Sequence, residues 1–193
     1  MKTVFVDVDT QLDFLSPSGA LYVPGAEAIV DNVARLNRWA ESQGILVISD
    51  TDAHREDDPE FADWPPHCVA GTLGQQKPAA TLLAQRVTVA SDAPVPELSG
   101  IAQVILEKQT LDCFGCPNMA TLLERVAADR FVVYGVVTEI CVAHAAIGLL
   151  KWGSVELVTD AVKELDPTVR DRFFAEFTSS GGVLTSVDAV TRS

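Results

Sequence analysis

The 193-residue sequence is poor in basic side chains. It has 14 lysines and arginines against 27 aspartates and glutamates, which gives a formal net charge of −13. So negative a surface repels phosphate backbones and anionic lipid headgroups, and it argues against nucleic acid and membranes as partners. Repeats and low-complexity segments are also lacking. With 48% apolar residues, the chain is expected to form one domain over residues 1–193.

Long apolar runs are missing as well. No stretch approaches the ~18 uninterrupted apolar residues of a membrane span. The opening MKTVFVDVDT reaches an acidic residue too early for the core of a signal peptide. We therefore expect a cytoplasmic location. The sequence has only four cysteines, and without a secretory signal they are expected to be thiols, not a disulfide framework.

Short apolar runs alternate with amphipathic segments along the chain. Six runs are predicted to be strands: residues 3–8, 45–50, 102–108, 130–137, 155–160 and 182–187. Helices are predicted between them, over residues 26–44, from Pro117, over about residues 141–152 and from Asp166. Strands this apolar would not tolerate a wet face. The pattern thus predicts a three-layer α/β/α fold with a mostly parallel sheet of about six strands.

Three reactive side chains lie at or after the ends of predicted strands. Asp9 follows the first strand, Lys108 ends the third, and Cys141 follows the link after the fourth. In parallel sheets such ends meet at one edge, where sites form. Each residue also has an ordinary interpretation, as a solvated strand end for Asp9 and Lys108 and as a buried structural thiol for Cys141.

Cys141 has the position of a nucleophile, because free N–H groups and the dipole at a helix start stabilise a thiolate and could hold an oxyanion. If Asp9 and Lys108 converge on it, the lysine would lower the pKa of the thiol and the carboxyl, and the aspartate could carry a proton. His144 lies one turn further on and could pair with Cys141. Its alanine neighbours favour a packing or interface position instead.

A second cluster of polar side chains follows the strand over residues 45–50. Asp52 and His54 are two residues apart, and His67 arrives after a loop. One carboxylate and two imidazoles suit a divalent transition metal, with zinc the first expectation and iron or manganese as alternatives. Glu60 or Asp57 could add a fourth oxygen. The alternative is an acidic, solvated loop in which His67 caps a turn.

Two further thiols, Cys113 and Cys116, have the CxxC spacing of a redox pair or of half a zinc site. A single CxxC is a weak signal, and the alternative is a loop that lines a pocket with two thiols. Cys68, directly after His67, is expected to be structural.

Several motifs together resemble one family. DTQLDF (9–14), EK (107–108) and GVVTEICV (135–142) resemble the opening aspartate motif, the catalytic-lysine strand and the nucleophile turn of the isochorismatase-like cysteine hydrolases. DAH (52–54) followed by WPPHCVAGT (64–72) resembles the nicotinamidase branch. The resemblance covers nearly the whole chain and implies the isochorismatase-like hydrolase fold.

By position, the resemblance implies that Cys141 is the nucleophile, Asp9 the general acid/base and Lys108 the third catalytic residue. It implies a cis peptide between Val136 and Val137, with the N–H groups of Val137 and Cys141 as an oxyanion hole. The implied ligands of one divalent transition metal are Asp52, His54 and His67. The implied pocket residues are Phe14 and Trp64, which would sandwich a flat ring. The loop KQTLDCFGCPN departs from the family pattern, and Phe114 is the aromatic expected there.

The activity so implied is hydrolysis of nicotinamide, or a similar ring carboxamide, to the acid and ammonia through a thioester. The alternatives are a carbamoyl, ureido or other small amide substrate, or a binding protein whose site is idle. The partner expected is thus a small amide molecule. Trp39 and Trp152 on apolar helix faces favour subunit contacts, so a homodimer or homotetramer is expected.

Overall fold

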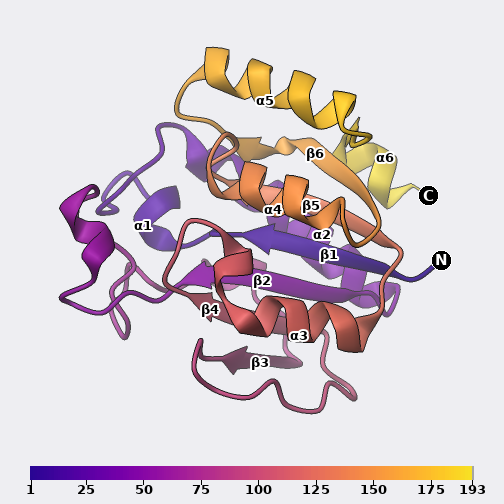
Figure 1. The fold of residues 1–193 in the computed structure, drawn as a ribbon, viewed down its shortest axis with the longest axis horizontal. Coiled ribbons are helices and arrows are strands. Elements are labelled where there is room, and N and C mark those ends of the chain that lie inside the picture. The colour runs from indigo at the N-terminus through magenta and orange to yellow at the C-terminus, as the bar shows by residue number, and fades with distance from the viewer. Residues whose placement is uncertain (193) are drawn as a thin grey trace.

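The computed structural model describes residues 1–192, and its central sheet lies between two layers of helices (Figure 1). The sheet has seven described strands, all parallel, in the order β3-β4-β2-β1-β5-β6-β7. In chain order the strands are β1 (Thr3–Val8), β2 (Leu46–Asp52), β3 (Arg86–Val89), β4 (Gln103–Lys108), β5 (Arg130–Val136), β6 (Ser154–Lys163) and β7 (Val183–Thr185). The predicted three-layer α/β fold is confirmed.

The edge strand β3 was not among the six predicted. It has four residues, RVTV, of which Arg86 and Thr88 are exposed and only Val89 is buried. So short and half-exposed a run gives no apolar signal, and β3 forms because β4 offers it a partner, with Val89 beside Leu106.

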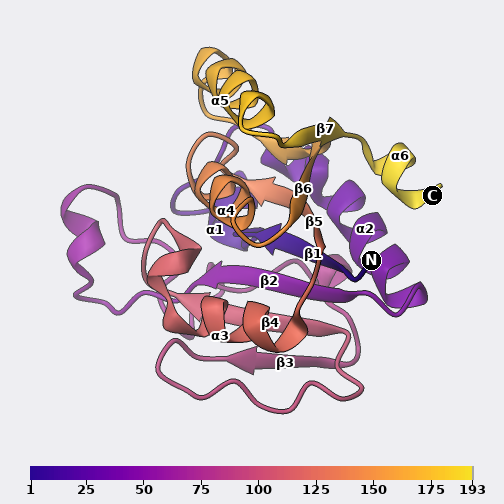
Figure 2. The same cartoon turned by 45° about the vertical axis from the view of Figure 1, so that its right-hand side comes forward.

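Helices cover both faces of the sheet (Figure 2). The α-helices are α1 (Leu12–Leu15), α2 (Val30–Ser42), α3 (Pro117–Val126), α4 (Cys141–Leu149), α5 (Pro167–Ser179) and α6 (Val187–Thr191). The short 3-10 helices are η1 (Ala26–Ile29), η2 (Pro59–Ala62), η3 (Ala79–Thr81) and η4 (Cys113–Gly115). Helices α2 and α6 pack on one face, and α3, α4 and α5 lie on the other. None of the described helices combines the length and the apolar character needed to span a bilayer.

The core is built around β1 and its neighbours. Phe5, fully buried on β1, stacks on Trp39 at 5.7 Å between ring centroids and meets Tyr134 edge-on at 6.1 Å. Gly135 of β5 has a φ of 125°, and a Cβ atom there would lie 2.0 Å from the Val8 carbonyl oxygen. Only glycine therefore lets β1 and β5 approach this closely.

The direction of the chain positions the site. The chain passes from β1 to β2, which lies on one side of β1, and β5 lies on the other side. The carboxyl ends of β1, β2, β4 and β5 consequently surround a topological switch point, where α/β proteins form their sites.

Candidate active site

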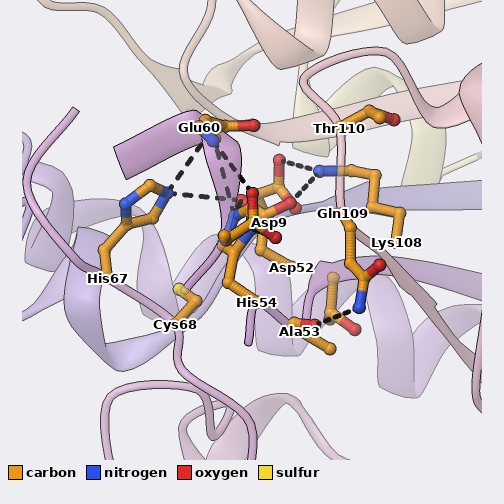
Figure 3. A network of polar contacts seen from close by, with 12 residues as sticks. Asp9, Asp52, Ala53, His54, Glu60, His67, Cys68, Lys108, Gln109 and Thr110 are labelled. Atoms are coloured by element: carbon orange, nitrogen blue, oxygen red, sulfur yellow. Dashed lines mark hydrogen bonds and ion pairs between the residues drawn. The ribbon is translucent and has the colours of Figure 1, made fainter. Parts of the chain in front are cut away.

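The three side chains predicted to be catalytic meet at this switch point. Asp9, Lys108 and Cys141 are 1%, 0% and 5% exposed. The Lys108 Nζ atom lies 3.0 Å from Asp9 Oδ2 and also contacts Asp52 Oδ1 (Figure 3). The Asp9 carboxyl also lies close enough to the Cys141 thiol for each group to shift the pKa of the other. Asp9 thus joins the lysine and the thiol.

Burial controls the charge states in this cluster. Desolvation and the nearby Asp52 raise the pKa of Asp9 to about 7, although Lys108 opposes them. Burial and Asp9 also raise the pKa of the Cys141 thiol well above its usual range. Lys108 lowers the pKa of the thiol and of the carboxyl, as expected, but burial outweighs it and both pKa values are raised. At rest the thiol is protonated, and the Asp9 carboxylate is positioned to accept its proton.

Asp50 of β2 is a further buried acid, which was not among the predicted catalytic residues. It is 1% exposed, and neither carboxyl oxygen has a hydrogen-bond partner among the described residues. Desolvation raises its pKa well above the usual range, despite the opposing charge of Lys108. Burial therefore favours the neutral form of this carboxyl, which lies near Lys108, Asp9 and Asp52.

The predicted metal ligands also converge. Asp52 Oδ2 lies 3.7 Å from His54 Nε2 and 3.8 Å from His67 Nε2, and the three ligand atoms lie within 4.8 Å of one another (Figure 3). The Nδ1 atom of each histidine contacts an oxygen atom that does not belong to this set of three residues. His54 Nδ1 is 3.0 Å from Asp58 Oδ2, and His67 Nδ1 is 2.7 Å from the Pro65 carbonyl oxygen. Contacts of this kind turn the Nε2 atoms toward a common centre.

The residues around this centre fit a bound cation. Glu60 Oε1 lies 3.9 Å from His54 Nε2 and 3.8 Å from His67 Nε2. Both Glu60 Oε1 and His54 Nε2 are buried without a hydrogen-bond partner among the described residues, which is costly unless another group binds them. Two imidazoles with carboxylate oxygen are the donors a divalent transition metal takes. Asp57 is exposed, so Glu60 is the acid that reaches the centre. His67 is buried, which excludes the solvated-loop alternative.

One pocket connects the thiol and this centre, since Cys141, Asp52 and His67 all line it. Its apolar wall is formed by Phe14, Leu21, Val23, Trp64, Leu111 and Leu165. No lysine or arginine is among the lining residues, whereas Asp52 and Glu60 are. The pocket is thus apolar with an acidic end.

Four residues near Cys141 in the fold or the sequence lie outside the lining of the pocket: Phe114, His144, Cys113 and Cys116. Phe114 does not line the pocket, because its ring packs against Gly148 of α4, and Leu111 of the same loop provides the wall. His144 is exposed, unlike the buried Cys141, so it neither pairs with the thiol nor packs. Cys113 and Cys116 are buried free thiols outside the pocket.

The peptide bond between Val136 and Val137 is cis, as the resemblance implied. Val137 and Cys141 both line the pocket. Cys141 is the first residue of α4, so its N–H group has no acceptor within the helix.

Comparison with known proteins agrees with this geometry. The family model for the isochorismatase domain matches residues 3–189. A nicotinamidase of Escherichia coli strain K12 is 27% identical, over 92% of this chain and 91% of the relative. A maleamate amidohydrolase of Pseudomonas putida is 25% identical, over 98% of this chain and 85% of the relative. A pyrazinamidase of Pyrococcus horikoshii, solved in complex with zinc, has a TM-score of 0.79 and 28% identity, over 96% of this chain and 99% of that one.

The family model spans almost the whole chain, and the fold is the one that the motifs predicted. The chain therefore belongs to the isochorismatase family.

Proposed function

We propose that this isochorismatase-family amide hydrolase converts nicotinamide, or a similar neutral ring carboxamide, to the acid and ammonia. The observation that carries the proposal is that the buried thiol of Cys141 and two members of the metal set, Asp52 and His67, line one largely apolar pocket. A flat ring with a nitrogen at one end and a carboxamide at the other matches both ends of such a pocket.

The charge of the pocket favours a neutral substrate over an anionic one. Maleamate carries a carboxylate, and no lysine or arginine lines the pocket to pair with it. A buried charge without a partner costs several kcal/mol, so a carboxylate placed against the apolar wall, away from the metal set, is disfavoured. The aromatic rings of Phe14 and Trp64 favour a planar, uncharged ring instead.

Asp52, His54 and His67 would hold a divalent metal, which would supply a Lewis-acidic partner for the lone pair of a ring nitrogen. The protein groups do the rest of the binding. Phe14 and Trp64 pack against the ring and exclude water, and the carboxamide is left facing Cys141.

Acylation then follows from the charge states. Asp9 takes the thiol proton, and the Cys141 sulfur forms a bond to the amide carbon. The N–H groups of Val137 and Cys141 stabilise the negative oxygen that develops. Asp9 returns the proton to the amide nitrogen, the carbon–nitrogen bond breaks, and ammonia leaves a thioester on Cys141.

Deacylation reverses the roles of the same groups. Asp9 removes a proton from a water molecule, which attacks the thioester carbon. The carbon–sulfur bond breaks, the proton returns from Asp9 to the sulfur, and the carboxylic acid leaves. Lys108 contacts Asp9 throughout and moderates the cost of its negative charge.

Ammonia release from a panel of amides tests the proposal. Nicotinamide is expected to be hydrolysed with a far higher kcat/KM than maleamate or an N-carbamoyl amino acid. Cys141→Ala should abolish turnover and keep bound metal, while Cys116→Ala, another buried thiol outside the pocket, should retain turnover. Preference for maleamate would overturn the substrate assignment. Wild-type rates in Cys141→Ala would overturn the nucleophile.

A further inference from the structure

Two polar side chains in the segment over residues 9–13, Gln11 and Asp13, are not used by the reaction and contact the loops of the metal set. After β1 ends at Val8, the chain turns sharply at Asp9, whose φ is 48°, and the Gln11 N–H donates to the Asp9 carbonyl at 2.7 Å. Gln11 is fully buried and does not line the pocket. Asp13 also points away from it, into neighbouring loops.

The Gln11 side chain forms the hydrogen bonds to the Asp52 backbone that a neighbouring strand would otherwise form. Its Oε1 accepts from the Asp52 N–H at 2.8 Å, and its Nε2 donates to the carbonyl oxygens of Asp52 and Gln75, both at 2.8 Å. One side-chain amide therefore satisfies both backbone groups of Asp52 at the point where β1 has turned away. Without it, a buried N–H and a buried carbonyl next to the carboxylate would lose their partners.

The Asp13 side chain likewise accepts hydrogen bonds from backbone N–H groups, one of them in the loop that carries His67. Its Oδ2 accepts from the Cys68 N–H at 2.7 Å, and its Oδ1 accepts from the Ala20 N–H at 2.9 Å. Cys68, directly after His67, has a φ of 44°, an unfavourable conformation that needs support from its surroundings. The Asp13 carboxylate is also confined by Gly74, where a Cβ atom would lie 2.1 Å from Oδ2.

The two loops are joined to each other as well. The His54 N–H donates to the Cys68 carbonyl at 3.1 Å, and the Ala70 N–H donates to the His54 carbonyl at 2.9 Å. A displacement of either loop would therefore be transmitted to both histidines.

From these contacts we propose that Gln11 and Asp13 are positioning residues for the metal centre. Gln11 fixes the backbone of Asp52, Asp13 fixes the turn that presents His67, and the same short segment carries Asp9. The proton-transfer group and the metal ligands are in this way held in register by residues 9–13. The inference rests on the proposed function, because it takes Asp52, His54 and His67 to be a metal site.

Cobalt(II) alone, without substrate, is the probe, with affinity measured by chelator competition and coordination read from the visible absorption spectrum. Loss of contacts that orient metal ligands weakens binding about 10- to 100-fold. Gln11→Ala and Asp13→Asn are each expected to weaken cobalt binding by this factor and to change the spectrum.

Gln103 provides the matched control. It is also a fully buried glutamine, and its amide makes three hydrogen bonds, to the Leu83 N–H, the Ser49 hydroxyl and the Thr81 carbonyl. Gln103→Ala removes a comparable buried network away from the centre and is expected to lower stability while leaving cobalt affinity and spectrum unchanged. If Gln11→Ala does not fold, Asp13→Asn carries the test, because it keeps the side-chain shape and replaces one acceptor oxygen with a donor.

The outcomes separate the two proposals. Folded variants that bind cobalt as tightly as the wild type, with the same spectrum, would refute the positioning role and leave the metal site intact. Equal weakening in Gln103→Ala would refute it too, because general destabilisation would then explain the loss. Wild-type protein that binds no cobalt would overturn the metal site of the proposed function and this inference with it.

Discussion

Amide hydrolysis by this protein is expected to slow on acidification, because Asp9 must be ionised to accept the Cys141 proton. Burial and the nearby Asp52 raise the pKa of Asp9 to about 7. In an enzyme that needs the carboxylate, kcat/KM falls tenfold for each pH unit below that value, so it should be ~100-fold lower at pH 5 than on the plateau. An aspartate with an ordinary pKa of ~3.9 would leave kcat/KM almost unchanged at pH 5.

The assay is ammonia release from nicotinamide between pH 5 and 9, with metal content measured at each pH so that loss of metal is not mistaken for titration of Asp9. Lys108→Met supplies the internal check. Lys108 lowers the pKa of Asp9 through its charge and its hydrogen bond, so its removal should move the acid limb of the residual activity to higher pH. A flat profile down to pH 5 at full metal content, or a shift of the limb to lower pH in Lys108→Met, would refute this reasoning.

Two further changes test the metal site and the core. Exhaustive chelation should remove activity that added divalent metal restores, and His54→Ala should prevent the restoration, as followed by ammonia release; full activity in the chelated protein would contradict the metal site. Phe5→Ala should lower the free energy of unfolding by ~3–5 kcal/mol in urea denaturation, because a fully buried ring between Trp39 and Tyr134 is lost. A loss below ~1 kcal/mol would show that the core around β1 can repack.

The fold and the main site residues were predictable because their signals are local. Continuous apolar runs mark buried parallel strands, and the rule that sites form at the carboxyl ends of such strands selected Asp9, Lys108 and Cys141. Those three side chains do lie together. Strand β3 was not predicted, because an edge strand of four residues needs no apolar pattern.

Other features depend on contacts that no local pattern records. The neighbours of Phe114 and the exposure of His144 follow from how η4 and α4 pack and from which face of α4 is buried. The direction in which the Cys141 thiol pKa moves depends on whether burial or the charge of Lys108 has the larger effect. That balance can be judged only from the structure. The contact of Asp58 with His54 and the hydrogen bonds of Gln11 join loops whose course the sequence does not reveal.

Lys108 links two activities that a protein engineer would prefer to vary separately. Its single ammonium group contacts Asp9, the proposed proton carrier, and Asp52, one of the proposed metal ligands. Replacing Asp52 to accommodate a different metal would leave Lys108 with Asp9 as its remaining ion-pair partner and alter the basicity of the proposed proton carrier. Redesign of the metal centre and redesign of the proton relay must consequently be carried out together.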